Sequence, residues 1–152
     1  MRTVYDILGS KPDPENIITP DALVIDALNM LNSVNLSYLI VMEGKQYKGV
    51  FSERDYSRNV ILKGRSSSST FIKDVMTTDL PVVHTNDTVE HCMHVMNLSK
   101  TRYLVAFGAE NEFEGIITIH DLLRQVIANK ELVFDTDIAE QLINNDERGD
   151  VY

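Results

Sequence analysis

Apolar positions recur along this chain in two series that have the same order. In the first series they return at the three- and four-residue spacing that is typical of one face of an α-helix, at Val24, Ala27, Leu28 and Leu31. The runs YLIVM, from residue 38, and YKGVFS, from residue 47, flank a polar turn and predict a two-strand hairpin. A second helix is predicted over residues 54–64. The pattern therefore predicts a unit of the order α-β-β-α.

The second half of the chain repeats this unit. The runs YLVAF and FEGIIT predict the second hairpin, and the helical stripe before it consists of Val89, Cys92, Met93 and Met96. The segment VYDIL (4–8) also resembles IKDVM (72–76), so each copy has a similar lead-in. We therefore predict an internal duplication with copies at residues 1–65 and 66–129. The Gly- and Ser-rich segment 64–70 is the expected linker, and an acidic helix and tail are expected at residues 130–152.

The starts of the two first helices carry different signals. Pro20 and Asp21 are common at helix starts, and Asp87 or Thr88 is expected to cap the corresponding helix of the second copy. We therefore expect helices at residues 23–35 and 88–96. Just before them, the repeat matches Thr19 to Thr85.

The two copies are most alike in one short element, which reads GVFSERDYSR at residues 49–58 and GIITIHDLLR at residues 115–124. Each has a glycine, two apolar or aromatic residues, a hydroxyl, an aspartate and an arginine at the same spacing. A glycine in a strand allows another backbone or a flat ligand to approach closely. The hydroxyl, Ser52 or Thr118, falls at a strand-to-helix junction, where free N–H groups attract phosphate.

The charged residues of the element have the chemistry of a nucleotide site. Asp55 and Asp121 fall in a first helical turn, and a carboxylate has two acceptor oxygens that match the adjacent hydroxyls of a ribose. Arg58 and Arg124 share a helix face with these aspartates and have the bidentate geometry that phosphate requires. Further positive character comes from the preceding residues, Arg54 and His120. An adenosine nucleotide is the ligand that this combination indicates.

Helix capping explains the same residues equally well. A hydroxyl followed three residues later by a carboxylate is also a capping box, and Asp with Arg three residues on is a common helix surface pair. The duplication does not decide between the two interpretations, because a duplicated fold also duplicates its caps.

Composition and charge narrow the class of protein. The chain has 152 residues, of which 43% are hydrophobic, and this is ordinary for a globular protein with a core. Its net charge of −9 argues against binding to nucleic acid or to an anionic membrane. A single cysteine excludes an internal disulfide and fits a reducing compartment. No segment has the length and apolarity of a signal peptide or membrane helix. We therefore expect a cytoplasmic protein.

Catalytic and metal-binding patterns have little support. His91 and His94 lie three residues apart on a predicted helix, but Cys92 is expected to face the core, and two histidines without a carboxylate on the same face are weak evidence for a metal. The chain has no glycine-rich phosphate loop and no nucleophile elbow. We therefore expect neither an enzyme nor a metal site.

The chain resembles a tandem pair of cystathionine-β-synthase domains, called CBS domains, of which a pair is known as a Bateman module. The resemblance is carried by residues 49–55 and 115–121, by IKDVMT (72–77) and by TVEHCMHVM (88–96), and it covers residues 3–129. The stretch 54–70 resembles in particular the stand-alone CBS-pair proteins of bacteria. The resemblance implies an α+β fold of two βαββα-like repeats, packed sheet to sheet with pseudo-two-fold symmetry.

The resemblance also implies a regulatory module of signal transduction that acts as an energy or redox sensor. Its ligand would be AMP, ADP, ATP, NAD(H) or S-adenosylmethionine, bound in clefts between the repeats as a regulatory ligand and not as a catalytic cofactor. The aspartates would hold the ribose, the hydroxyls would contact ribose or phosphate, and Thr19 with Leu23 and Thr85 with Thr88 would line the base pockets. Leu23 departs from the small or hydroxyl residue usual there, so the two clefts need not be equivalent. The expected ligand-binding set is Thr19, Leu23, Phe51, Ser52, Arg54, Asp55, Arg58, Thr85, Thr88, Ile117, Thr118, His120, Asp121 and Arg124.

Two further expectations concern partners. The resemblance implies a homodimer that forms through the helices, and the lack of an effector domain in this sequence points to an unidentified protein target. The alternative is a structural or oligomerisation module that retains the fold and its caps without binding a nucleotide.

Overall fold

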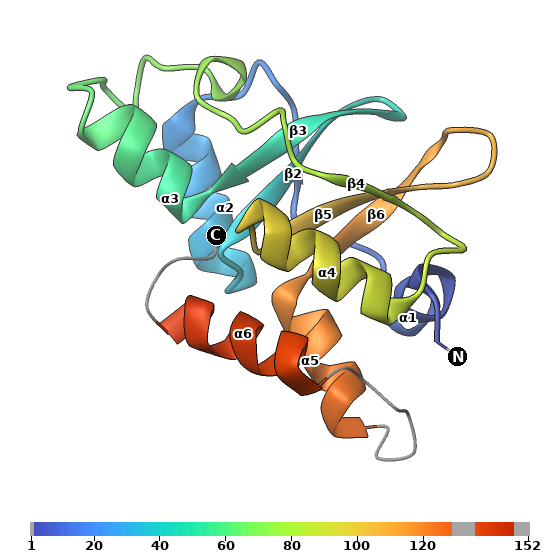
Figure 1. Ribbon diagram of the computed structural model, residues 1–152. Coiled ribbons are helices and arrows are strands. Elements are labelled where there is room, and N and C mark those ends of the chain that lie inside the picture. Colours follow the sequence, from blue (N-terminus) through green and yellow to red (C-terminus); the bar gives the residue numbers. More distant parts are fainter. Residues whose placement is uncertain (1, 129–135, 148–152) are drawn as a thin grey trace. The chain divides into compact units, whose positions relative to one another are not determined.

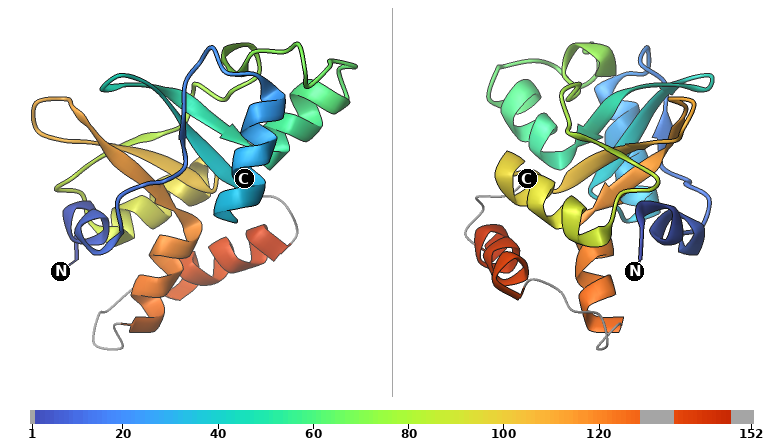
Figure 2. Two further views of the ribbon diagram at one scale, coloured as in Figure 1. Left: turned by 180° about the vertical axis from the view of Figure 1, so that it is seen from behind. Right: turned by 45° about the vertical axis from the view of Figure 1, so that its right-hand side comes forward.

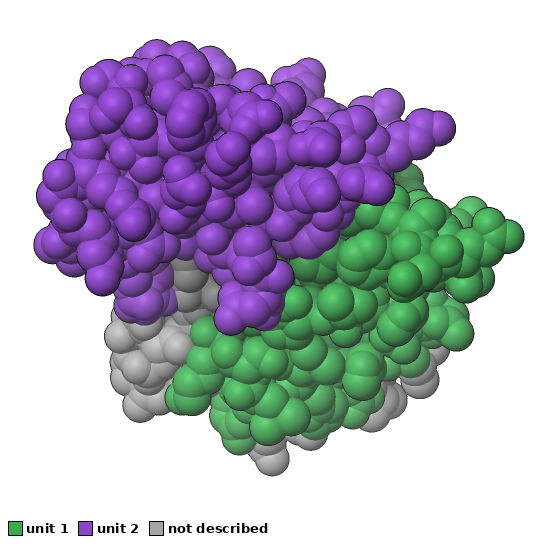
Figure 3. Space-filling model, turned by 90° about the horizontal axis from the view of Figure 1, so that it is seen from above, with its two compact units in different colours: residues 1–12, 80–152 green, residues 13–79 purple. Residues whose placement is uncertain are grey.

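The computed structural model describes residues 2–128 and 136–147 (Figure 1). They form two compact units, one of residues 13–79 and one of residues 1–12 with 80–152 (Figure 3). The units do not coincide with the copies predicted at residues 1–65 and 66–129, because each unit combines one copy with the lead-in of the other. The lead-in VYDIL therefore belongs to the unit of the second copy, and IKDVM to the unit of the first.

The unit of residues 13–79 contains the first copy. Its elements in chain order are β1 (Ile17–Ile18), α2 (Val24–Val34), β2 (Tyr38–Glu43), β3 (Gln46–Ser52), α3 (Glu53–Asp55) and the short helices η1 (Tyr56–Ile61) and η2 (Ile72–Asp74). The strands form one sheet in the order β1-β2-β3, in which β1 is parallel to β2 and β3 is antiparallel to it. The predicted helix and hairpin are confirmed. The periodicity missed β1, because two residues are too short to show an alternation.

The other unit repeats this arrangement with additions at both ends. It contains α1 (Val4–Ser10), β4 (Val82–His84), α4 (Val89–Ser99), β5 (Tyr103–Phe107), β6 (Phe113–Thr118), α5 (Ile119–Ala128) and α6 (Thr136–Glu147). Its sheet has the order β4-β5-β6, again with one parallel and one antiparallel pair. Both copies are therefore of the βαββα type that the resemblance implies. Figure 2 shows these elements from two further directions.

The second helix of the first copy differs from its prediction. A regular helix is expected over residues 54–64, but only α3 is α-helical, and η1 is a π-helix in which the N–H of Leu62 donates to the carbonyl oxygen of Ser57. The hydroxyl of Ser57 donates to the carbonyl oxygen of Glu53 at 3.2 Å. This side-chain bond competes with the regular ladder at that turn. The corresponding helix of the second copy, α5, is a regular α-helix.

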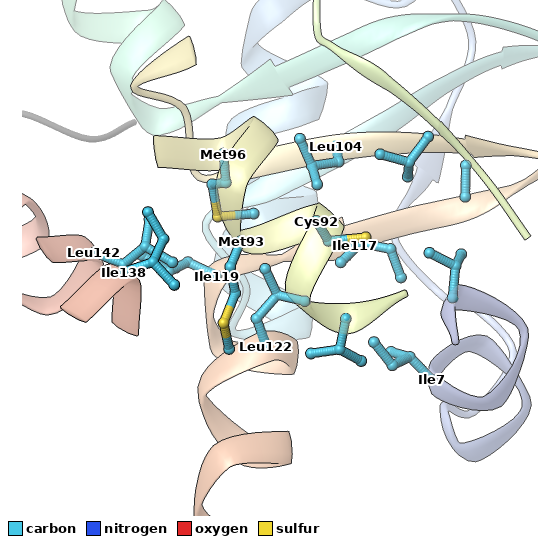
Figure 4. Packing of buried hydrophobic residues seen from close by; sticks show 14 residues of the cluster. Ile7, Cys92, Met93, Met96, Leu104, Ile117, Ile119, Leu122, Ile138 and Leu142 are labelled. Atoms are coloured by element: carbon cyan, nitrogen blue, oxygen red, sulfur yellow. The ribbon is translucent and has the colours of Figure 1, made fainter. Parts of the chain in front are cut away.

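The C-terminal helix contributes to the core of its unit. Helix α6 packs against α4, and its residues Ile138 and Leu142 are buried beside Met93 and Met96 (Figure 4). The expected acidic C-terminal helix is thus confirmed, and the tail expected after it lies outside the described residues, as does the segment 129–135. Among the described helices, none has both the length and the apolarity to cross a membrane.

Each unit has one apolar core on the helical side of its sheet. In the unit of the first copy, Phe51 of β3 is fully buried among residues of α2, β2 and the lead-in. In the other unit, Ile117 of β6 has the position that corresponds to Phe51, and Cys92 of α4 is buried in the same cluster (Figure 4). Burial raises the pKa of the Cys92 thiol to about 12, so this cysteine is a core residue and not a reactive thiolate.

Candidate functional site

The repeated element of the first copy forms a capping box at the start of α3. Ser52 and Asp55 are both buried, with 1% and 6% of their surfaces exposed. The backbone N–H of Ser52 donates to Asp55 Oδ2 at 2.9 Å, and the N–H of Asp55 donates to Ser52 Oγ at 3.2 Å. Each residue thus satisfies a group of the other at the helix end. The capping interpretation is therefore confirmed for this copy.

The lead-in of the second copy holds the other oxygen of Asp55. Thr77 Oγ1 donates to Asp55 Oδ1 at 2.7 Å, and the backbones of Thr77 and Val50 exchange hydrogen bonds of 2.8 and 2.9 Å. Gly49 makes this approach possible, since a Cβ atom there would lie 2.6 Å from the Thr77 carbonyl oxygen. Burial raises the pKa of Asp55, although the hydrogen bonds from Thr77 and Ser52 act in the opposite direction. Both carboxylate oxygens of Asp55 therefore accept bonds from neutral donors.

The second copy has the same cap but a different environment around its carboxylate. The N–H of Thr118 donates to Asp121 Oδ2 at 2.9 Å, and the N–H of Asp121 donates to Thr118 Oγ1 at 3.2 Å. Lys11, from the lead-in of the first copy, donates through Nζ to Asp121 Oδ2 and to the carbonyl oxygen of Ile116, both at 2.9 Å. The aspartate is 4% exposed. The lead-in thus brings a cationic donor to the capping oxygen of Asp121, whereas in the first copy it brings a neutral hydroxyl to the other oxygen of Asp55.

The remaining oxygen of Asp121 is held from the solvent side. Arg124 donates to Asp121 Oδ1 at 3.3 Å, and the side chain of this arginine is 71% exposed. A long hydrogen bond from an exposed side chain contributes little to stability and breaks at little cost. Asp121 Oδ1 thus accepts this bond from an exposed side chain, whereas Asp121 itself is buried. Asp55 has no such oxygen, because Thr77 holds its Oδ1 at 2.7 Å.

Comparison with protein families identifies the duplicated unit. The model of the CBS domain matches residues 4–61 and 72–128, which together make up most of the chain. The chain belongs to the CBS-domain family. Stand-alone CBS pairs are regulatory modules, and CBS domains found in enzymes are separate regulatory parts of them.

Individual relatives agree with this assignment. The mitochondrial CBS domain-containing protein CBSX3 of Arabidopsis thaliana is 30% identical over 134 residues, which are 82% of this chain and 65% of that protein. The chain thus spans less than two thirds of this relative. A CBS-domain protein of Burkholderia ambifaria MC40-6 has 31% identity and a TM-score of 0.77 over 87% of this chain and 98% of its own. CBSX2 of Arabidopsis thaliana, solved in complex with AMP, has 25% identity and a TM-score of 0.69 over 85% and 98%.

The CBS lead-ins show which residues of the two predicted base pockets are equivalent. The N–H of Lys73 donates to the carbonyl oxygen of Pro20 at 3.0 Å, and the N–H of Tyr5 donates to that of Thr85 at 2.9 Å. Thr85 therefore corresponds to Pro20. The match of Thr19 to Thr85 is wrong by one residue, because the spacing between the copies is one residue shorter before the hairpin turn than after it.

The other pair of predicted base-pocket residues stands at the starts of α2 and α4. Thr88 is the N-cap of α4, and its hydroxyl accepts a bond from the N–H of His91 at 3.0 Å. Leu23 is the N-cap of α2 and has no side chain for this purpose. Instead, the first N–H groups of α2 donate to the carbonyl oxygens of Thr70 and Ser67, both at 2.9 Å. The expected linker thus completes the cap that Leu23 lacks.

The remaining predicted site residues are distributed between core and surface. The side chains of Phe51 and Ile117 lie in the two cores. Only the backbone groups of these two residues are therefore left to contact a ligand. Arg58 and His120 are exposed, and Arg54 is half-buried. The predicted pairing of aspartate with the arginine three residues later is present for Arg124; the described contacts of Asp55 come from Ser52 and Thr77 instead.

Two residues that contact the aspartates were not predicted from the sequence. Thr77 and Lys11 approach from lead-ins that are 22 and 110 residues away along the chain. No local pattern identifies such partners, because they depend on which copy each lead-in joins. The similarity of VYDIL to IKDVM was the available signal, since equivalent lead-ins dock at equivalent places.

The histidines of α4 lie beside different carboxylates. His91 Nε2 lies 3.9 Å from Asp87 Oδ2, and His94 Nε2 lies 3.8 Å from Glu90 Oε1. The two imidazoles thus face different carboxylates. Within residues 2–128 and 136–147, no group of three or more suitable side chains is arranged to hold a metal ion.

Proposed function

We propose that this CBS pair is a regulatory module that binds an adenine nucleotide at the repeated element of its second copy. The observation that carries the proposal is the state of Asp121, a buried carboxylate in which one oxygen, among residues 2–128 and 136–147, accepts a bond only from an exposed arginine. A carboxylate oxygen that is held by an exposed side chain can exchange that partner for a ligand at little cost in stability. The AMP complex of CBSX2 supports an adenine nucleotide as the ligand class.

The contacts of Asp121 suggest how the ligand is held. A ribose hydroxyl donates to Oδ1 in place of Arg124, while Oδ2 keeps its bonds from Thr118 and Lys11. The displaced guanidinium then turns to the phosphate, for which its fork of donors is well suited. The cap of α5 remains intact throughout, so binding does not cost the stability of the helix.

The position of Lys11 at the end of helix α1 suggests how a bound ligand could change the surface of the module. Lys11 ends the lead-in helix α1, so a ligand that engages Asp121 also acts on the docking of this helix. Binding shifts the population of the docked lead-in, and the surface that includes α1 changes for a partner protein. In this role the module senses the level of AMP, ADP, ATP, NAD(H) or S-adenosylmethionine, as an energy or redox sensor.

Thermal unfolding of the purified chain tests this proposal. AMP, ADP, ATP, NAD⁺, NADH and S-adenosylmethionine are each added at about 1 mM to the wild type, Asp121→Asn and Asp55→Asn. A ligand at about 100 times its dissociation constant contributes about 2.7 kcal/mol, which raises the Tm of a domain of this size by several degrees. We expect this rise in the wild type and in Asp55→Asn, and its loss in Asp121→Asn. Each variant is compared with its own ligand-free Tm.

Two results would contradict the proposal. Loss of the rise in Asp55→Asn alone would move the ligand to the first copy. No rise with any ligand would favour a non-binding assembly module. Helix capping would then be a sufficient reason for both aspartates. Light scattering then decides, since an assembly module forms a homodimer or larger oligomer through apolar side chains left exposed on its helices, such as Leu98 at 83% and Ile127 at 75%.

A further inference from the structure

We propose that Lys11 makes the site of the second copy selective for adenine ligands that carry phosphate. The first copy lacks this phosphate anchor because Asp79 stands at the position equivalent to Lys11. This inference rests on the proposed function. It adds which class of ligand the site takes and which residue selects it.

The structure fixes Lys11 at the edge of the site. Its backbone N–H donates to the carbonyl oxygen of Leu8 at the end of α1, and Leu8 packs against Gly115 of β6. Gly115 has a φ of +156° and has no side chain, and a Cβ atom there would lie 2.7 Å from Leu8 Cδ2. The glycine of the repeated element therefore allows the lead-in to approach closely enough for Lys11 to reach Asp121.

Lys11 has a donor left for a ligand. An ammonium group has three N–H donors, and two of them bond to Asp121 Oδ2 and to the Ile116 carbonyl oxygen. Within residues 2–128 and 136–147 these are the bonds of the ammonium group, and the side chain is 26% exposed, so the third donor is within reach of solvent. A phosphate oxygen accepts from it without breaking either existing bond. Lys11 therefore serves the site as an anchor for phosphate as well as a partner for Asp121.

The charges around Asp121 favour an anion. One carboxylate stands against two cationic groups, Lys11 and Arg124, so the cluster has a net charge of +1 before a ligand arrives. A phosphate monoester is attracted to this cluster, and the sulfonium cation of S-adenosylmethionine is repelled by it. Adenosine offers the same base and ribose but gains nothing from the excess positive charge.

The first copy has the reverse arrangement. When VYDIL is aligned with IKDVM, Lys11 falls on Asp79. Asp79 lies close enough to Asp55 for its negative charge to act on that carboxylate, and the hydrogen-bond donors around Asp55 are the neutral Ser52 and Thr77. A phosphate placed here would have the charge of Asp79 nearby, where the second copy has the ammonium group of Lys11. The duplicated element thus differs in charge at one equivalent lead-in position.

Calorimetric titration of the full chain with AMP and with adenosine tests the role of Lys11. The variants are Lys11→Met, which keeps the apolar stem, and Lys11→Arg, which keeps the charge. A hydrogen bond to a charged group corresponds to about a 10- to 100-fold change in affinity. We expect Lys11→Met to weaken AMP by this factor and to change adenosine by less than about threefold. Lys11→Arg should restore most of the preference for AMP. Asp79→Asn is the matched control, in which the ratio of the two affinities should stay as in the wild type.

The outcomes separate this inference from the proposed function. If AMP binds and Lys11→Met weakens AMP and adenosine by the same factor, Lys11 only supports the fold and the inference is wrong. The inference is also wrong if Asp79→Asn changes the ratio as much as Lys11→Met does. If the folded wild type binds neither compound and none of the other ligands named above raises its Tm, the proposed function itself fails. A circular dichroism melt of each variant shows whether it folds, and Lys11→Arg keeps the test valid if Lys11→Met does not.

Discussion

The two copies of the repeated element have the same helix cap and differ in what holds the outer oxygen of the aspartate. In the first copy, Thr77 holds Asp55 Oδ1 at 2.7 Å inside the protein. In the second copy, the exposed Arg124 holds Asp121 Oδ1 at 3.3 Å, and Lys11 bonds to the inner oxygen. The difference teaches that the duplicated sequence determines the cap, whereas the lead-in that docks beside it determines whether the carboxylate is left available to a ligand.

The two glycines of the element illustrate the same division. Gly49 faces a backbone carbonyl group of its lead-in, and Gly115 faces the end of a leucine side chain. Both are required for close packing, but a backbone group moves less easily than a side chain. The first copy is therefore closed more rigidly around its aspartate than the second.

The largest effect is expected when this closure is broken at Gly49. In Gly49→Ala the new Cβ atom lies 2.6 Å from the Thr77 carbonyl oxygen, so the lead-in must move away and its bonds to Val50 and Asp55 are lost. We expect a loss of about 3 kcal/mol in the free energy of unfolding, from overpacking and lost hydrogen bonds. Urea unfolding followed by circular dichroism measures it.

Gly9→Ala is the control for this substitution. Gly9 lies in α1, and a Cβ atom there would meet nothing within 4 Å. Alanine favours helix by about 0.5–1 kcal/mol over glycine, so this variant should be at least as stable as the wild type. Equal destabilisation by both substitutions would show that the contact with Thr77 is not what requires glycine at position 49.

A smaller effect is expected from removing the outer partner of each aspartate. Thr77→Val keeps the shape of the side chain but leaves a buried carboxylate oxygen without its donor, which costs about 1.5–3 kcal/mol. Arg124→Ala removes an exposed partner and should cost less than about 0.5 kcal/mol. Chemical unfolding of the two variants compares them directly. Equal costs would mean that Asp121 Oδ1 is held as firmly as Asp55 Oδ1, and the argument for an available acceptor would fail.

The sequence predicted the local elements well because they depend on local patterns. The helical stripes, the hairpins and the capping boxes involve residues that are at most a few positions apart, and the structure has all of them. The cap at Thr88 was also predicted, since its hydroxyl bonds only three residues ahead. Short elements without a period were missed, as β1 was. The π-helix η1 was missed too, because its sequence has no pattern that distinguishes it from an α-helix.

The partners of the aspartates were not predictable in the same way. Lys11 and Thr77 reach the site only because each lead-in joins the unit of the other copy. Leu23 is a similar case, because its missing cap is supplied by carbonyl groups of Thr70 and Ser67 that lie more than 40 residues further on. The sequence thus predicted which residue types the two elements share. Which lead-in residue contacts each aspartate could be seen only in the tertiary structure.

The smallest effect is expected in how the stability of the protein depends on pH. Two capping-box aspartates, the exposed Asp6 and the buried Asp55, contribute to it. Asp6 caps Thr3 on the surface, where bonds from the Thr3 backbone and hydroxyl lower the pKa of Asp6. Such a lowered pKa contributes stability above the unfolded pKa of about 3.9, and this stability is lost as the pH falls through the folded value. Burial raises the pKa of Asp55, so its contribution is present below the unfolded pKa and is lost as the pH rises.

The two asparagine variants should therefore differ from the wild type in opposite directions between pH 3.5 and pH 7. The destabilisation by Asp6→Asn is expected to shrink as the pH is lowered, and that by Asp55→Asn to grow. Urea midpoints measured at half-unit pH steps give both profiles, and the difference between wild type and variant removes the titration of all other groups. Parallel profiles would show that the lead-in does not exclude enough water from Asp55 to disfavour its charge. Asp6 and Asp55 accept the same kind of capping bond from a backbone N–H group. Opposite slopes would therefore show that the pKa values of the two aspartates differ because Thr77 and Gly49 pack around Asp55.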